Sequence, residues 1–227
     1  MNEENIKKLV EDKNNFLKLA EKIKDKFDGP SSYFYLRTIE KTKKFQEEYK
    51  SLLEDNSFFE YLYATLTSWG MHRMDKNTRM TNFENFKESI LKNKEKIIKL
   101  SKLNLMEVNL DEFKEDILEI FNSLKIMSRK DAPKFVANSK IMHFLLPNLI
   151  PPMDKGHITY FFYGRVNDKG KKYIPSIKNE EETFWEVLKK FQEIAQRLKL
   201  TKKDLINDWD TSIPKIIDNA IIGFNIR

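Results

Sequence analysis

The sequence predicts an all-α globule of nine to ten helices in a chain of 227 residues. Apolar residues recur through most of the chain at the three- and four-residue spacing that amphipathic helices require. No stretch alternates apolar and polar residues over the length of a strand. A hydrophobic fraction of 40% at this length suffices to bury a core, which excludes a chain that is largely disordered.

Five helices are predicted in the first half of the chain. The first covers residues 6–27 and stops at a Gly-Pro pair, and the second covers about residues 31–53. The third covers residues 57–69, where nearly every residue is apolar, and a glycine ends it. The helices over residues 81–100 and 109–124 each open at Thr or Asn with Glu three residues later, the spacing of a capping box.

Five more helices are predicted in the second half. Prolines force an extended stretch after the first of them, because proline lacks an N–H and disfavours α-helix in the residue before it. A loop at 164–178 contains two glycines and a proline and has room for a small hairpin. The predicted helices cover residues 132–146, 154–163, 180–199, 202–209 and 212–223.

The helices are predicted to form one all-α unit over residues 1–227. Two lobes with a cleft between them are an alternative arrangement. In that case residues 1–55 pack with residues 180–227, and residues 56–163 form the second lobe. The sequence assigns no oligomeric state.

Composition excludes several classes of function. The chain has no cysteine, so disulfides, cysteine-ligated metals and cysteine nucleophiles are excluded. Its six glycines never cluster as a phosphate loop requires, and its three histidines are far apart, so we expect no metal or other cofactor. Because no signal peptide and no long apolar run is present, we expect a cytoplasmic protein with no membrane partner.

Positive charge is concentrated in one segment. The formal net charge is +6, and residues 128–173, with nine basic and three acidic residues, account for all of it. A local basic segment on an otherwise neutral chain predicts an anionic partner, and nucleic acid is the usual one. A solvated lysine-rich loop is the alternative.

Asp154 is the most informative acidic residue of this segment, because it follows Pro151 and Pro152 at the predicted start of a helix. As an N-cap it would accept hydrogen bonds from backbone amides, which favour the ionised carboxylate. A carboxylate fixed among basic and aromatic residues can stabilise a developing cation or orient a nucleophile. The alternative is that Asp154 is a helix cap and nothing more.

The stretch from residue 128 to residue 158 resembles the core signature of the helix-hairpin-helix DNA glycosylases, especially their archaeal 8-oxoguanine branch. The family's Pro-x-Asp-x-His is similar to residues 152–157 (PMDKGH), with one residue inserted. Its Pro-Lys-Val-Ala is similar to residues 133–137 (PKFVA), and its lysine-bearing helix is similar to residues 139–145 (SKIMHFL). The family's hairpin contains glycine, whereas residues 127–132 contain none, so Arg129 and Lys130 would supply charge there.

The resemblance implies a DNA glycosylase and lyase that acts on a flipped, damaged base. Lys140 or Lys134 would attack the sugar as an amine, and Asp154 would stabilise the sugar cation. Lys134 has the family's spacing to Asp154, while Lys140 has the matching context, so both stay open. The implied DNA-binding residues are Arg129, Lys130, Lys155, His157, Arg165, Lys171 and Lys172. The implied base pocket comprises Trp69, His72, Phe144 and Tyr160.

Two other functions remain compatible with the sequence. A helical nucleic-acid-binding protein without catalytic chemistry would use the same basic segment. A helical protein-interaction module would use the loop at 164–173 to contact an acidic protein. The alternative for Trp69 and Tyr160 is that they belong to the hydrophobic core.

Overall fold

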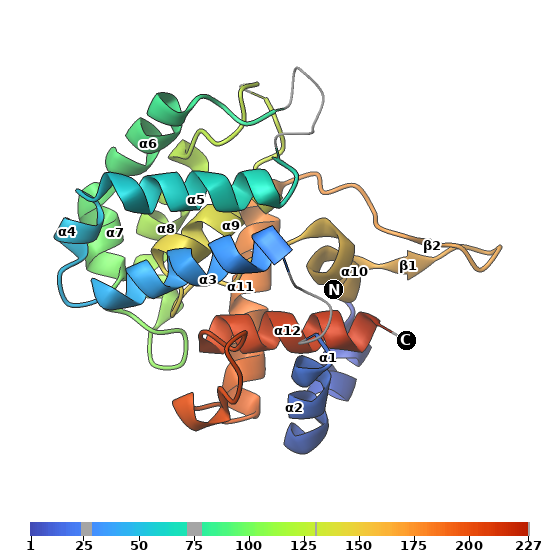
Figure 1. Ribbon diagram of the computed structural model, residues 1–227. Coiled ribbons are helices and arrows are strands. Elements are labelled where there is room, and N and C mark those ends of the chain that lie inside the picture. Colours follow the sequence, from blue (N-terminus) through green and yellow to red (C-terminus); the bar gives the residue numbers. More distant parts are fainter. Residues whose placement is uncertain (24–28, 72–78, 130, 227) are drawn as a thin grey trace.

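The computed structural model describes residues 1–23, 29–71, 79–129 and 131–226. Within these ranges the protein is an all-α globule with one small hairpin, as the sequence predicts (Figure 1). The first seven helices are α1 (Glu3–Val10), α2 (Lys13–Glu21), α3 (Gly29–Lys44), α4 (Tyr49–Leu52), α5 (Asn56–Ser68), α6 (Phe83–Leu91) and α7 (Lys94–Leu100). The other five are α8 (Lys114–Ser123), α9 (Phe135–Leu145), α10 (Tyr160–Tyr163), α11 (Glu180–Arg197) and α12 (Ile213–Asn225).

The described ranges hold twelve α-helices, more than the nine to ten predicted, because the predicted helices over residues 6–27, 31–53 and 81–100 are each divided in two. The prediction of one helix over residues 6–27 is wrong. The Asp12 carboxylate accepts hydrogen bonds from the amides of Asn14 and Asn15 and so begins α2. The predicted helix over residues 81–100 is likewise divided into α6 and α7.

Two predicted helix boundaries are also wrong. Asn82, not Thr81, caps α6 by accepting a hydrogen bond from the Asn85 amide. The Thr81 amide instead donates to the Ile126 carbonyl and joins two segments distant in sequence. The predicted helix over residues 202–209 is reduced to the single 3-10 turn η4 (Lys202–Asp204). Another 3-10 turn, η2 (Leu110–Phe113), precedes α8.

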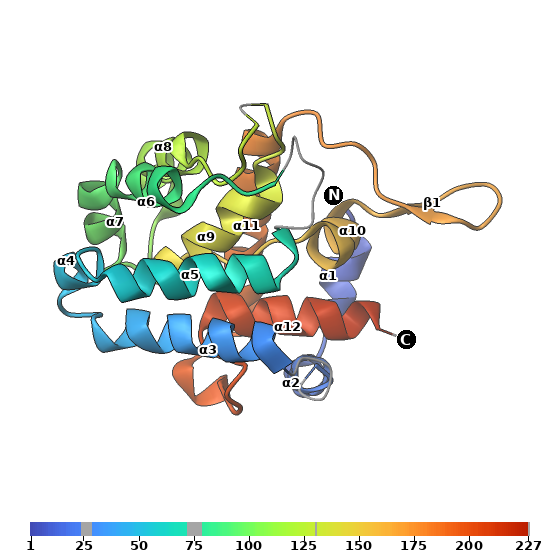
Figure 2. The ribbon, with the colours of Figure 1, turned by 45° about the horizontal axis from the view of Figure 1, so that its top comes forward.

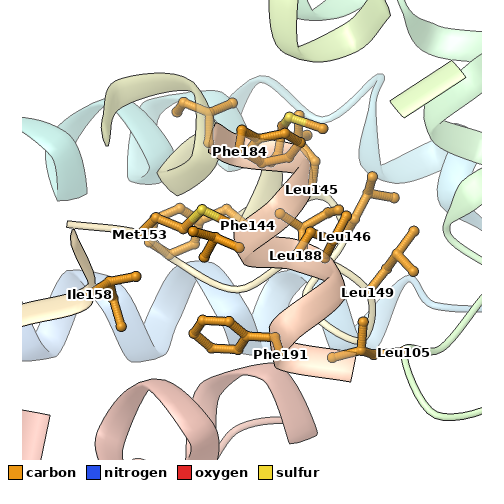
Figure 3. Close-up of a cluster of buried hydrophobic side chains, with 14 of the residues drawn as sticks. Leu105, Phe144, Leu145, Leu146, Leu149, Met153, Ile158, Phe184, Leu188 and Phe191 are labelled. Atoms are coloured by element: carbon orange, nitrogen blue, oxygen red, sulfur yellow. The ribbon is translucent and has the colours of Figure 1, made fainter. Parts of the chain in front are cut away.

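The helices pack in pairs around α11. In both ribbon views α3 lies along α5, and α12 lies beside α2 (Figures 1 and 2). Helix α11 contacts α8, α9 and α12, and α9 in turn contacts α3, so α11 and α9 together join the two pairs. Phe184, Leu188 and Phe191 project from it into the same cluster as Leu145 and other apolar side chains (Figure 3). All of these side chains are buried.

The buried hydrophobic residues form one continuous cluster that runs from α1 to α12. The cluster joins residues 1–55, 56–163 and 180–227, the segments that the sequence assigns to two lobes. The division into lobes stays a prediction. What the cluster establishes is that helices from both ends of the chain share one apolar interior.

The predicted loop at 164–178 contains a two-stranded antiparallel hairpin, β1 (Arg165–Val166) and β2 (Lys172–Tyr173). It follows α10 directly and extends away from the helices in both ribbon views (Figures 1 and 2). Every residue from 165 to 173 is exposed. The hairpin is therefore held to the body mainly at its base.

Helix α12 approaches α2 most closely at Gly223. A Cβ atom added there would lie 1.9 Å from the Leu19 carbonyl oxygen. The Gly223→Ala variant should therefore unfold at a lower urea concentration, with a loss of about 1–3 kcal/mol or more from overpacking. Gly156→Ala is the control, because its added Cβ would meet nothing nearer than 3.8 Å. Equal urea midpoints for Gly223→Ala and Gly156→Ala would contradict the close approach of α12 to α2 at Gly223.

Candidate active site

A cavity of about 470 Å³ opens among four helices and the proline-rich segment. Its wall includes residues from the start of α3, the end of α5, the middle of α9 and the inner side of α12. The lining residues are Ser31, Tyr35, Ser68, Trp69, Gly70, Lys140, Pro152, Met153, Asp154, Trp209, Lys215, Asp218 and Ile222. Aromatic rings, two amines and two carboxylates thus surround one space.

Lys140 enters this cavity from α9. The helix is apolar on most of its surface, and its other residues are buried except for half-buried Val136. The Lys140 Nζ lies 4.7 Å from the centre of the Trp69 ring. Burial lowers the pKa of this amine below its ordinary value, and the negative charges of Asp154 and Asp218 oppose that shift. A lowered pKa makes the neutral, nucleophilic form of the amine more accessible.

Asp154 lines the cavity at the end of the proline-rich segment. Its Oδ1 accepts hydrogen bonds from the amides of His157 and Ile158, at 2.6 and 3.4 Å. These bonds cap the single π-helical turn η3 (Lys155–Thr159), so the predicted helix start at Asp154 is confirmed. The Ser139 hydroxyl donates to the Met153 carbonyl at 3.3 Å. Because these two residues adjoin Lys140 and Asp154, this bond helps to fix the amine relative to the carboxylate.

The structure adds a buried ion pair that sequence reasoning missed. The Lys215 amine lies 2.6 Å from the Asp218 carboxylate, and both side chains are less than a tenth exposed. The same amine lies over the rings of Tyr35 and Trp209, at 5.6 and 5.8 Å from their centres. Burial raises the pKa of Asp218, and the Lys215 charge opposes that rise. Two charged residues within a mostly apolar helix were the available signal in the sequence.

A buried hydrogen-bond chain orients the aromatic wall. Burial lowers the pKa of His143 to about 3, so its ring is neutral, and its Nδ1 donates to the Ile150 carbonyl. Its Nε2 is then an acceptor for the Tyr35 hydroxyl at 3.2 Å, and that hydroxyl accepts from Thr211 at 2.7 Å. The Tyr35 ring stacks on Trp209, with centres 5.3 Å apart. The chain therefore fixes the ring that faces the cavity.

Three of the residues predicted for catalysis or base binding line this cavity together: Lys140, Asp154 and Trp69. Lys134 does not, because it precedes the first turn of α9 and its amine donates to the Asn122 carbonyl at 3.0 Å. Phe144 lies behind the wall, fully buried, with its ring centre 5.4 Å from that of Trp69.

Tyr160 is half-buried in α10, where the Lys172 amine lies 5.6 Å from its ring centre, and it is not part of the lining. His72 and Lys130 lie outside the described residues.

The residues predicted to bind DNA occupy two places. Arg129 is exposed in the segment before α9 and pairs with Asp131 at 2.7 Å. The others follow Asp154 in sequence. Lys155 is exposed and His157 half-buried in η3, and Arg165, Lys171 and Lys172 are exposed on the hairpin. Within the described ranges the buried Nδ1 of His157 makes no hydrogen bond.

No family model, no curated protein and no solved structure matches this chain. Among the residues that the structure describes, no helix is both long and apolar enough to cross a membrane. In the same ranges, no three His, Asp or Glu side chains lie close enough together to hold a metal ion.

Removing one member of the buried ion pair should strongly destabilise the fold. Lys215→Met leaves the Asp218 carboxylate buried without its partner, at a cost of about 3–5 kcal/mol. The folded state then binds a proton that the unfolded state has lost, so stability falls as pH rises through the raised pKa of Asp218. Urea unfolding should show a larger loss at about pH 8 than at about pH 5.

Lys92→Met is the matched control, because Lys92 and Glu88 form an exposed ion pair four residues apart on α6 and its C-cap. It should cost no more than about 0.5 kcal/mol, with little change between the two pH values. Equal losses in the two variants would show that the buried ion pair contributes no more to stability than the exposed one.

Proposed function

We propose that the protein is a DNA glycosylase and lyase that removes a damaged base from a flipped nucleotide. The proposal rests on one observation: Lys140 and Asp154 line the same cavity, and the Lys140 amine lies over the Trp69 ring. Lys140 is one of the two candidate amines, and Asp154 is the carboxylate, that the resemblance to helix-hairpin-helix glycosylases implies for the reaction. We also propose that it acts in the cytoplasm.

The cavity has the size and lining that a flipped nucleotide requires. Its volume of about 470 Å³ falls within the usual range for small-molecule sites. Enzymes that act on a base in a duplex commonly rotate it into such a pocket and stack it on aromatic side chains. Trp69, Tyr35 and Trp209 provide rings at this cavity, while the Lys215–Asp218 pair adds polar groups for the base edge.

The reaction follows from the chemistry of the two groups. The neutral Lys140 amine attacks C1′ of the sugar, and the bond from C1′ to the base breaks. The base leaves with that electron pair and takes up a proton. The Asp154 carboxylate faces the positive charge that develops on the sugar. Loss of a proton from the bound amine and opening of the sugar ring then give an imine between Lys140 and C1′.

The basic segment supports a nucleic acid as the partner. All of the net charge of +6 is attributable to residues 128–173, which include Asp154 and the hairpin. Phosphate contacts by such cations supply affinity without depending on the base sequence. If the cavity lacks chemistry, the same segment favours a helical nucleic-acid-binding protein as the second candidate.

Trapping with borohydride tests the proposed nucleophile. Wild-type protein with duplex DNA containing 8-oxoguanine should form a covalent adduct, because borohydride reduces the imine to a stable amine. Lys140→Met should form none, since the other lysine of the lining, Lys215, is held in its ion pair with Asp218. Lys134→Met is the control and should be trapped like the wild type, because its amine is bound to the Asn122 carbonyl outside the cavity. Adducts resolved on a denaturing gel are the measurement.

Thermal unfolding of each variant shows whether it folds. An adduct that persists in folded Lys140→Met would eliminate Lys140 as the nucleophile. If wild-type protein binds the duplex but forms no adduct with it, the second candidate replaces the first.

The Asp154→Asn variant tests the electrostatic link between the two groups. Asparagine can keep the cap at η3, but it removes a negative charge that opposes the lowered pKa of Lys140. The rate of adduct formation with abasic DNA should rise with pH as the amine becomes neutral. The pH at which this rate is half its maximum should be lower for the variant than for the wild type, because the pKa of Lys140 is lower without the charge of Asp154. Excision of 8-oxoguanine should fall about 10²–10³-fold, the effect of losing one electrostatic stabiliser.

Asp168→Asn, in the exposed hairpin, is the matched control and should leave both the midpoint and the excision rate unchanged. If the pH of half-maximal adduct formation stays in place or moves to higher pH in Asp154→Asn, the proposed electrostatic link between Asp154 and Lys140 is contradicted.

A further inference from the structure

The hairpin presents two different faces. Its register pairs Arg165 with Tyr173 and Val166 with Lys172. Directly paired residues project from the same face of a sheet, and residues two apart along a strand share a face. Arg165, Tyr173 and Lys171 therefore lie on one face, while Val166 and Lys172 lie on the other.

The face of Lys172 is the one next to the helices, because the Lys172 amine lies over the Tyr160 ring of α10. The face of Arg165, Lys171 and Tyr173 is the opposite one. Tyr173 is 43% exposed there, which leaves the ring of a large side chain in solvent. Within the described ranges, Arg165 and Lys171 form no ion pair within 4.0 Å. A partly exposed ring beside two cations without an ion-pair partner in the described ranges thus occupies the outer face.

The turn holds this face in a defined shape. The Asn167 side chain accepts hydrogen bonds from the amides of Lys169 and Lys171, at 3.1 and 2.8 Å. The Asn167 amide also donates to the Lys171 carbonyl at 3.0 Å, which extends the ladder beyond the two paired residues. Gly170 has a φ of +73°, a conformation that glycine adopts without strain.

We propose that this face binds nucleic acid, with Tyr173 stacked on an unpaired base and Arg165 and Lys171 on the flanking phosphates. Aromatic stacking and phosphate contacts together are how proteins hold single strands. An acidic polypeptide would need the cations but not the ring, so it fits the face less well. The inference rests on the proposed function for the choice of DNA, but it places a second contact outside the cavity.

Fluorescence anisotropy of the full-length protein with a labelled single-stranded oligonucleotide tests the stack. Tyr173→Ala should weaken binding about 5- to 150-fold, the effect expected for one base–aromatic stack. Tyr173→Phe should bind like the wild type, because stacking needs the ring and not the hydroxyl. Val166→Ala, on the other face, should also bind like the wild type.

A second oligonucleotide, built from tetrahydrofuran residues, keeps the phosphates but has no bases and no aldehyde. Wild type and Tyr173→Ala should bind it equally. Arg165→Gln combined with Lys171→Gln should reduce the slope of log affinity against log salt by about 1.4 on single strands.

The inference fails if Tyr173→Ala binds the base-containing strand as the wild type does, or if Tyr173→Phe is as weak as Tyr173→Ala. Polyglutamate that competes fully with the oligonucleotide, with no effect of Tyr173→Ala, would identify an acidic protein partner instead and also overturn it. The proposed function fails separately. Borohydride trapping at Lys140 reports the reaction in the cavity, whereas anisotropy with the single strand reports contact with the hairpin face, so either proposal can fail while the other holds.

Discussion

The burial of helix α9 is the constraint on which the cavity depends. Its residues from Phe135 to Leu145 pack on nearly all sides, and Lys140 is the only lysine or arginine among them. An ammonium group enclosed by apolar side chains is costly unless it reaches solvent or an opposite charge. Lys140 lines the cavity, and there the charges of Asp154 and Asp218 oppose the effect of burial on its pKa. The same packing brings Ser139 to the Met153 carbonyl and so sets the neighbouring Asp154 at the cavity.

The four charged groups of the cavity have different tasks. Lys215 and Asp218 form a buried ion pair, with 2.6 Å between the amine and the carboxylate. This pair mainly keeps α12 in place beside the aromatic wall. Lys140 is different, since within the described residues its amine donates no hydrogen bond and has no ion-pair partner within 4.0 Å. Asp154 uses Oδ1 for the helix cap, which leaves Oδ2 for the cavity. The available pair is thus the one whose chemistry matches nucleophilic attack on a sugar.

The sequence predicted the fold class and most helices, because amphipathic spacing is a local property. It missed the break at Asp12, since the apolar periodicity continues through that residue while the cap is decided by two hydrogen bonds. It predicted Asp154 as an N-cap from the prolines before it. It left Lys134 and Lys140 open, because spacing along the chain does not show that α9 begins only at Phe135. The Lys215–Asp218 pair escaped notice because charges three residues apart on a helix are mostly exposed to solvent.

The cavity and the hairpin belong to one continuous piece of chain. Asp154 caps η3, and the Thr159 amide and hydroxyl both donate to the Asp154 carbonyl at 3.0 Å, so the turn is closed on its own first residue. Helix α10 follows without a break, and β1 begins after Gly164. A base held by Tyr173 would therefore be anchored to the same short segment that places the carboxylate. This arrangement favours a fixed distance between the outer contact and the sugar in the proposed reaction.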